Sequence, residues 1–192
     1  GVPVVVLAYT RLHAGGKFDK REGNSAYAFS GGLHGVGVSV TNALSTRIEV
    51  EIRRDGKIHR IDFANGGEDI GAVRIEGDCG RQSGTRVRVW PDAKYFESPR
   101  VPMHELERLL RSKAVLLSGV SVRLDVEQAG GGMQSKTWTY PEGLAGYLKE
   151  LAGDIDAVAP IFTAEKYAGK DDSSFAPGEG AAWALAWFES AV

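Results

Sequence analysis

Hydrophobic and polar residues alternate along several short stretches of this chain, with the two-residue period of a half-buried β-strand. The clearest stretches are residues 47–53 and 85–90, and residues 120–124 follow the same pattern. Asp55-Gly56 follows the first stretch and favours a two-residue hairpin turn, because both positions accept positive φ. Ile61 and Phe63 then continue the pattern on a return strand. These segments predict a mostly antiparallel sheet.

Other stretches have helical spacing. Residues 103–117 place apolar side chains three or four positions apart with charges between them, which predicts an amphipathic helix. A second helix is predicted from Pro141 to about Leu151, and a short one over residues 38–44. Residues 3–13 are apolar and fit either a helix or a buried strand.

The remaining segments have the composition of loops. Residues 14–37 contain seven glycines, and residues 130–132 are three consecutive glycines that predict a hairpin loop. Residues 165–180 are polar and rich in Gly, Asp and Ser, so we predict a linker or a flexible loop there, followed by a last apolar strand at 183–188. The predicted class is α+β, with helices on one face of a mostly antiparallel mixed sheet.

Composition narrows the class of protein. The 192 residues are 43% hydrophobic and 25% charged, which suits one globular domain or one domain and part of another. The formal net charge of -2 does not favour a protein that grips duplex DNA over its whole surface; if the chain serves a DNA enzyme, we expect the DNA contact to lie mostly elsewhere. Cys79 is the only cysteine and no long apolar run is present, so we expect a cytoplasmic protein without an internal disulfide or a membrane segment. Both ends are apolar and the first residue is Gly1, so we expect a piece of a longer chain.

The most informative segment is Ser30-Gly31-Gly32-Leu33-His34-Gly35-Val36-Gly37, directly before the short predicted helix. Closely spaced glycines let main-chain amides turn inward, and a helix amino end adds N–H groups without partners. Phosphate is the usual ligand of such a site, while an ordinary structural turn is the alternative. The spacing fits neither a Walker A loop nor the G-x-G-x-x-G dinucleotide motif.

A family resemblance favours the phosphate site. The segments that carry it are Leu12–Phe18, Ser30–Val40 and Asn42–Ser45, with weaker matches at Gly84-Thr85 and Trp90-Pro91. They resemble the nucleotide-binding segments of the B subunits of bacterial type IIA DNA topoisomerases, GyrB and ParE, which are GHKL ATPases. Residues 90–100 and 183–187 resemble ParE of topoisomerase IV more than GyrB. The implied fold is the Bergerat-type α/β sandwich, here without its N-terminal part.

The resemblance implies that ATP is bound by Lys17, Tyr27, Gly31, Gly32, Leu33, His34, Gly35, Val36, Gly37, Val38 and Thr85. The amides from Gly32 to Val38 would surround the phosphates, and Lys17 would reach the terminal ones. Tyr27 would contact the adenine, although a loop tyrosine more often only packs. Thr85 would help bind adenine through a water and an aspartate.

Several expected parts of such an ATPase do not occur in this sequence. The family's general-base glutamate, the nearby asparagine that binds Mg²⁺ and the Asp-x-Gly-x-Gly motif would precede Gly1, and a lysine that touches the γ-phosphate would follow Val192. The cofactors implied are ATP and Mg²⁺, with no catalytic residue and no metal ligand in this chain. We therefore predict that the 192-residue chain alone does not hydrolyse ATP.

The sequence also allows predictions for Arg54 and for the four histidines. Arg54 matches an arginine at the rim of the nucleotide pocket, where aminocoumarin inhibitors also reach, and solvation beside the hairpin is its plain alternative. His13, His59 and His104 have no metal-ligand spacing. The resemblance implies that His34 is a loop residue beside the phosphates rather than a catalytic residue.

The resemblance also implies an organisation and a set of partners. Residues 1–165 would be a partial GHKL ATP-binding domain, and residues 166–192 a linker and the start of a transducer domain. In the intact enzyme the partners would be a ParC-like A subunit, a second B subunit and duplex DNA, with no membrane, while the fragment would be monomeric. Another GHKL enzyme, or a non-enzymatic α+β interaction module, remains as an alternative.

Overall fold

The alternation between residues 45 and 91 produces one antiparallel sheet in the computed structural model, which describes residues 1–14, 35–98, 100–169, 171, 173–174 and 179–189. Its strands are β1 (Ser45–Arg54), β2 (Lys57–Ala64), β3 (Asp69–Ile70), β4 (Arg74–Asp78) and β5 (Gly84–Pro91). They are ordered β3-β2-β1-β5, and β4 also pairs with β2. Every strand pair in the described residues is antiparallel, so no mixed sheet occurs there.

The hairpin that the sequence predicts joins β1 to β2. Asp55 has φ of 52° and Gly56 has φ of 76°, the positive values that a two-residue hairpin turn needs. Arg54 and Lys57 are the paired residues on either side of the turn. This local prediction is confirmed.

The two faces of this sheet differ in chemistry. Ile48, Val50, Ile61 and Phe63 are buried on one face, under the helices α1 (Val4–Thr10) and α2 (Gly37–Ala43). We call it the helix-bearing face. Residues 3–13 thus contain a helix rather than a strand, and the short helix predicted at 38–44 is confirmed. The charged residues that alternate with the core residues lie on the opposite, outer face.

The chain forms two compact units, Gly1–Pro99 and Arg100–Val192, and the sheet above belongs to the first. That unit also has the short 3-10 helices η1 (Asn65–Gly67) and η2 (Ala93–Tyr95). The second unit contains α3 (Met103–Leu116), β6 (Ser121–Glu127), β7 (Met133–Thr139), α4 (Gly143–Ala152), β8 (Phe162–Tyr167) and β9 (Gly180–Leu185). Its core is Ala114, Val115 and Tyr140, and the predicted helices and the glycine hairpin loop are confirmed.

The linker predicted at residues 165–180 is wrong at its start. Residues 162–167 form β8, which pairs along its length with β9. Five of the six β8 residues are exposed. A strand that is exposed in this way tolerates polar side chains, so its composition resembles that of a loop. The last strand likewise begins at Gly180, earlier than predicted, and ends at Leu185.

The sequence predicts a domain boundary between residues 165 and 166, and both residues lie in β8. The assignment of these segments to an ATP-binding domain and a following domain stays a prediction. No helix in the described part of the chain is long and apolar enough to cross a membrane.

Candidate functional site

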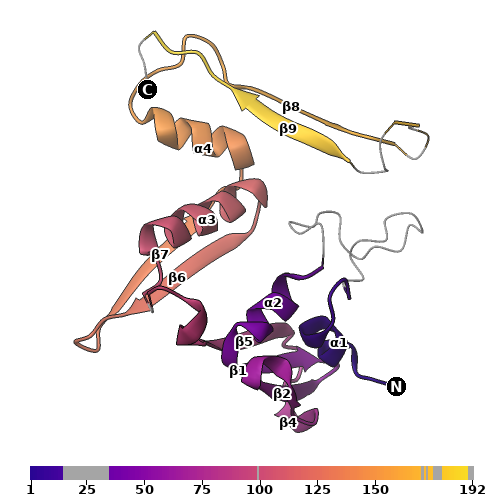
Figure 1. Cartoon of the computed structure of the whole chain (residues 1–192). Helices are drawn as coiled ribbons and strands as arrows, with labels where there is room; N and C mark the ends of the chain where they lie inside the picture. Colours follow the sequence, from indigo (N-terminus) through magenta and orange to yellow (C-terminus); the bar gives the residue numbers. More distant parts are fainter. Residues whose placement is uncertain (15–34, 99, 170, 172, 175–178, 190–192) are drawn as a thin grey trace. The chain divides into compact units, whose positions relative to one another are not determined.

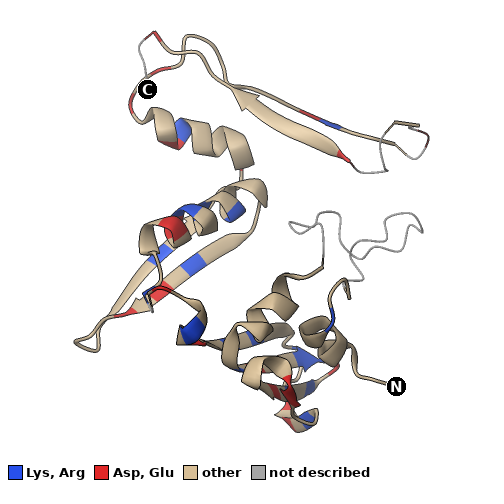
Figure 2. Ribbon diagram, in the orientation of Figure 1, with Lys and Arg blue, Asp and Glu red and all other residues tan. Residues whose placement is uncertain are grey.

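The two helices on the sheet are held by aromatic and aliphatic contacts. Val5, Val6 and Tyr9 of α1 pack against the sheet core, and the ring of Tyr9 stacks on Phe63 with centroids 5.2 Å apart. Burial raises the pKa of the Tyr9 hydroxyl above its ordinary value. Neither α1 nor α2 contains a Lys, Arg, Asp or Glu, as their tan ribbons show (Figure 2). An anion near them would therefore meet main-chain donors rather than helix side-chain charges.

The amino end of α2 is where the described part of the predicted phosphate segment lies. Gly35 has φ of 62°, in the left-handed region that favours glycine, and α2 begins two residues later at Gly37. No side chain caps this end, and Val38 is exposed. The first-turn N–H groups of a helix have no partner within the helix, so this end can donate to an acceptor. The Ser39 hydroxyl donates instead to the Val36 carbonyl, at 3.0 Å.

Thr85 lies on the helix-bearing face of β5. It pairs directly with Ile52, and directly paired residues in an antiparallel sheet share a face. Arg54 follows Ile52 by two positions, so it lies on the same face as a diagonal neighbour of Thr85. Both residues are exposed, and Arg54 forms an ion pair of 3.3 Å with Asp55. The structure therefore brings these two predicted residues to one end of the sheet.

The remaining predicted ATP-binding residues lie outside the described residues. They are Lys17, Tyr27, Gly31, Gly32, Leu33 and His34. Their roles stay predictions, as do those of Gly35, Val36, Gly37, Val38 and Thr85, whose positions are described but whose binding is untested.

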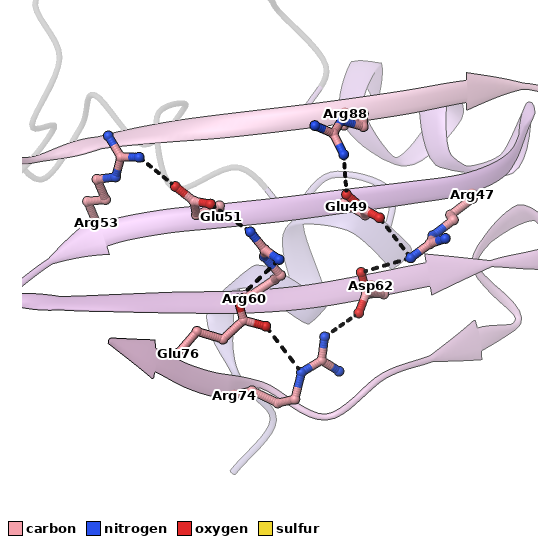
Figure 3. A network of polar contacts seen from close by, with 9 residues as sticks. All are labelled: Arg47, Glu49, Glu51, Arg53, Arg60, Asp62, Arg74, Glu76 and Arg88. Atoms are coloured by element: carbon pink, nitrogen blue, oxygen red, sulfur yellow. Dashed lines mark hydrogen bonds and ion pairs between the residues drawn. The ribbon is translucent and has the colours of Figure 1, made fainter. Parts of the chain in front are cut away.

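The outer face of the sheet carries an ion-pair network across β5, β1, β2 and β4 (Figure 3). Its members are Arg47, Glu49, Glu51, Arg53, Arg60, Asp62, Arg74, Glu76 and Arg88. Glu51 is its best-buried carboxylate, 2.8 Å from Arg60 and 2.9 Å from Arg53. Because each of these arginines already faces a carboxylate, the network stabilises the sheet and offers little free charge to a nucleotide.

The network predicts a loss of stability in acid. The hydrogen bond from Arg60, with the charges of Arg53 and Arg60, holds the pKa of Glu51 below its ordinary value. A lowered folded-state pKa stabilises the fold above the unfolded pKa of about 4.3, and this stabilisation disappears as the pH falls through the folded value. We expect the melting temperature of the wild type to fall more steeply below about pH 5 than that of Glu51→Gln.

Glu68→Gln is the matched control, because Glu68 is exposed and outside this network. Its melting curve series from pH 7 to pH 3 should parallel the wild type. Parallel curves for Glu51→Gln as well would contradict the role of Glu51.

A cavity of about 480 Å³ lies in the second unit, between α3, β7 and the start of α4. Arg111, Trp138 and Tyr147 are among its lining residues. Arg111 donates to the Tyr140 hydroxyl at 2.9 Å and pairs with Glu150 at 2.7 Å. Among the residues that the structure describes, none of those predicted to bind ATP lines this cavity.

The sequence did not predict the buried hydrogen bond of Asn42, which appears there only as part of the Asn42–Ser45 motif. Asn42 is 2% exposed, and its side-chain nitrogen donates to the Tyr9 carbonyl at 3.0 Å. A polar residue within a short helix gave no signal of burial, because its partner is 33 residues away.

Comparison with known proteins extends these observations. No family model matches the chain. The DNA topoisomerase 4 B subunit of Escherichia coli (strain K12) is 42% identical over 188 residues, which cover 97% of this chain and 28% of that protein. Its counterpart in Pseudomonas aeruginosa is also 42% identical over 188 residues, with the same coverage. The DNA gyrase B subunit of Haloferax volcanii is 41% identical over 152 residues, 78% of this chain and 22% of that protein.

Two solved structures have the same fold. The 43K ATPase domain of Thermus thermophilus gyrase B, in complex with an aminocoumarin, matches with a TM-score of 0.63 and 29% identity over 88% of this chain and 40% of that chain. The topoisomerase IV ATP-binding domain of Francisella tularensis, in complex with a small-molecule inhibitor, matches with a TM-score of 0.60 and 32% identity over 85% of this chain and 44% of that chain. The α+β class is thereby confirmed.

The chain is therefore homologous to the B subunits of type II DNA topoisomerases, and its fold is that of their ATPase domains. Within this class, the topoisomerase 4 relatives named above match more of the chain than the gyrase relative does. The chain spans about 28% of the length of these topoisomerase 4 relatives.

Proposed function

We propose that this chain is the ATP-binding part of a type II topoisomerase B subunit, most similar to that of topoisomerase IV. The match to two solved ATPase or ATP-binding domains over most of the chain carries this proposal. The amino end of α2, with Gly35 in the left-handed region and no charged helix side chain nearby, supports main-chain recognition of phosphate.

In the bound state the amides of the segment ending at Val38 would donate to the phosphate oxygens. Lys17 would add a mobile positive charge at the terminal phosphates. Thr85, on the helix-bearing face, would contribute its hydroxyl toward the adenine, and Arg54 would lie at the rim of the same pocket. Thr85 and Arg54 lie on the face of the sheet opposite the ion-pair network, which supports a nucleotide pocket on the helix-bearing face.

The partners and location belong to the same proposal. In the intact enzyme, ATP would close two B subunits into a gate that captures duplex DNA, together with a ParC-like A subunit. We further propose a cytoplasmic location, which the single cysteine favours.

The described residues show no cluster of side chains that could bind Mg²⁺, since they contain no group of three or more His, Cys, Asp or Glu that could hold a metal ion. We propose that Mg²⁺ accompanies ATP in the intact subunit with its ligands outside this chain, and that the 192-residue chain alone does not turn over ATP. Measurable ATP hydrolysis by the isolated chain would refute this.

Nucleotide binding is best tested by thermal shift of the complete subunit with a non-hydrolysable ATP analogue. A ligand at 100 times its Kd that binds only the folded state adds about 2.7 kcal/mol, which raises the melting temperature of a domain of about 150–250 residues by roughly 5–10 °C. We expect Lys17→Ala to reduce this rise strongly and Lys113→Ala, in α3 of the second unit, to preserve it. Absence of a rise in the wild type would contradict the proposed function.

A further inference from the structure

Asn42 joins three elements of the first unit. Its side-chain nitrogen donates to the carbonyl of Tyr9 in the last turn of α1, at 3.0 Å. The last carbonyls of a helix have no partner within the helix, so this bond satisfies one of them. Only the amide nitrogen can make the contact, because a carbonyl accepts and does not donate.

The third element is η1, the turn that follows β2. A Cβ atom on Gly67 would overlap the Asn42 side-chain nitrogen, and Gly67 has φ of +90°. The neighbouring Gly66 is also close to α2, since its Cβ would lie 3.1 Å from the Ala43 carbonyl oxygen. The Asn42 amide is therefore confined between α1 on one side and glycine backbone on the other.

Asn42 itself lies near the carboxyl end of α2, whereas Gly37 and Val38 lie at its amino end. The helix has seven residues, from Gly37 to Ala43, and is therefore about 10 Å long. A side chain near one end does not reach a phosphate held at the other end. It can act only by fixing where the helix lies.

We infer that Asn42 is a positioning residue for nucleotide binding, acting by fixing α2 against α1 and η1; this inference rests on the proposed function. Losing its bond to Tyr9 lets the two helices shift relative to each other. The amides of Gly37 and Val38 then no longer lie where the ligand needs them, although the sheet core beneath stays packed.

Ser45 provides the matched control. It is 3% exposed, and its hydroxyl donates to the Thr41 carbonyl at 2.6 Å, four residues earlier in the chain. Ser45→Ala therefore removes a buried hydrogen bond at the same end of α2 without touching the link to α1. A purely structural role for Asn42 predicts that the two variants behave alike.

The experiment measures the Kd of a non-hydrolysable ATP analogue by titration calorimetry, with the complete subunit, well below the melting temperature of every variant. We expect Asn42→Ala to weaken binding about tenfold, the effect of one buried hydrogen bond, and Ser45→Ala to change it less than about twofold. Hydrogen exchange of the α1 amides in the absence of nucleotide should accelerate in Asn42→Ala and not in Ser45→Ala.

Gly67→Ala tests the same contact without removing the Asn42 side chain. Its new Cβ displaces the amide, so we expect weaker nucleotide binding in the wild-type background and little further loss in Asn42→Ala. Unchanged affinity in Asn42→Ala, with nucleotide still bound by the wild type, would overturn the inference and leave the proposed function standing. A wild type that binds no nucleotide would overturn both, and the exchange of α1 would then show whether the link between the helices exists.

Discussion

Replacing Gly35 by valine should abolish the rise in melting temperature that an ATP analogue gives the complete subunit. Gly35 has φ of 62°, a value that a β-branched residue adopts only with strain. Valine would therefore force the backbone before α2 into another path, and the amides that follow would lose their direction. We expect a ligand-induced rise of roughly 5–10 °C in the wild type and almost none in Gly35→Val.

Gly80→Val controls for the strain itself. Gly80 belongs to the same unit, has φ of 56°, and has nothing within 4 Å of a built Cβ. Both variants should lose stability without ligand, by about 1–3 kcal/mol for a residue held in a sparsely populated conformation. Only Gly35→Val should lose the response to nucleotide, and an equal response in the two variants would show that the segment before α2 is not the phosphate site.

The elements that the sequence predicts correctly are those whose signals are local. The Asp55-Gly56 turn requires only two residues with positive φ, and α3 requires only apolar spacing within one helix. β8 has no such signal, because it is exposed on both sides and becomes a strand through pairing with β9. Its existence depends on a partner that follows more than ten residues later, so composition predicts a loop.

The candidate site likewise has some features that the sequence indicates and others that depend on the fold. Family resemblance indicates Gly35, Gly37 and Thr85 from their motifs, and the structure then shows why Thr85 and Arg54 are neighbours, through the register of β1 with β5. The burial of Asn42 and the ion pairs of Glu51 depend on residues brought together by the fold. No pattern in the neighbouring sequence distinguishes such residues from ordinary polar positions.

Phe63→Ala should cause the largest loss of stability in the first unit. Phe63 is fully buried among Ile48, Val50 and Ile61, and Tyr9 of α1 stacks on its ring. Truncating a buried phenylalanine to alanine costs about 3–5 kcal/mol, from lost burial and from the cavity that remains. This is a large part of the roughly 5–15 kcal/mol that typically separates a folded protein from its unfolded state.

Urea denaturation should show a lower transition midpoint in Phe63→Ala, with a slope close to that of the wild type. Phe96→Ala is the control, because Phe96 is 44% exposed in the same unit and its truncation leaves no core cavity. Equal shifts for the two variants would mean that Phe63 is not the centre of this core. Tyr9 of α1 stacks on Phe63, so the same variant should also bind an ATP analogue more weakly. The packing of the sheet would then determine the position of the helices that carry the site.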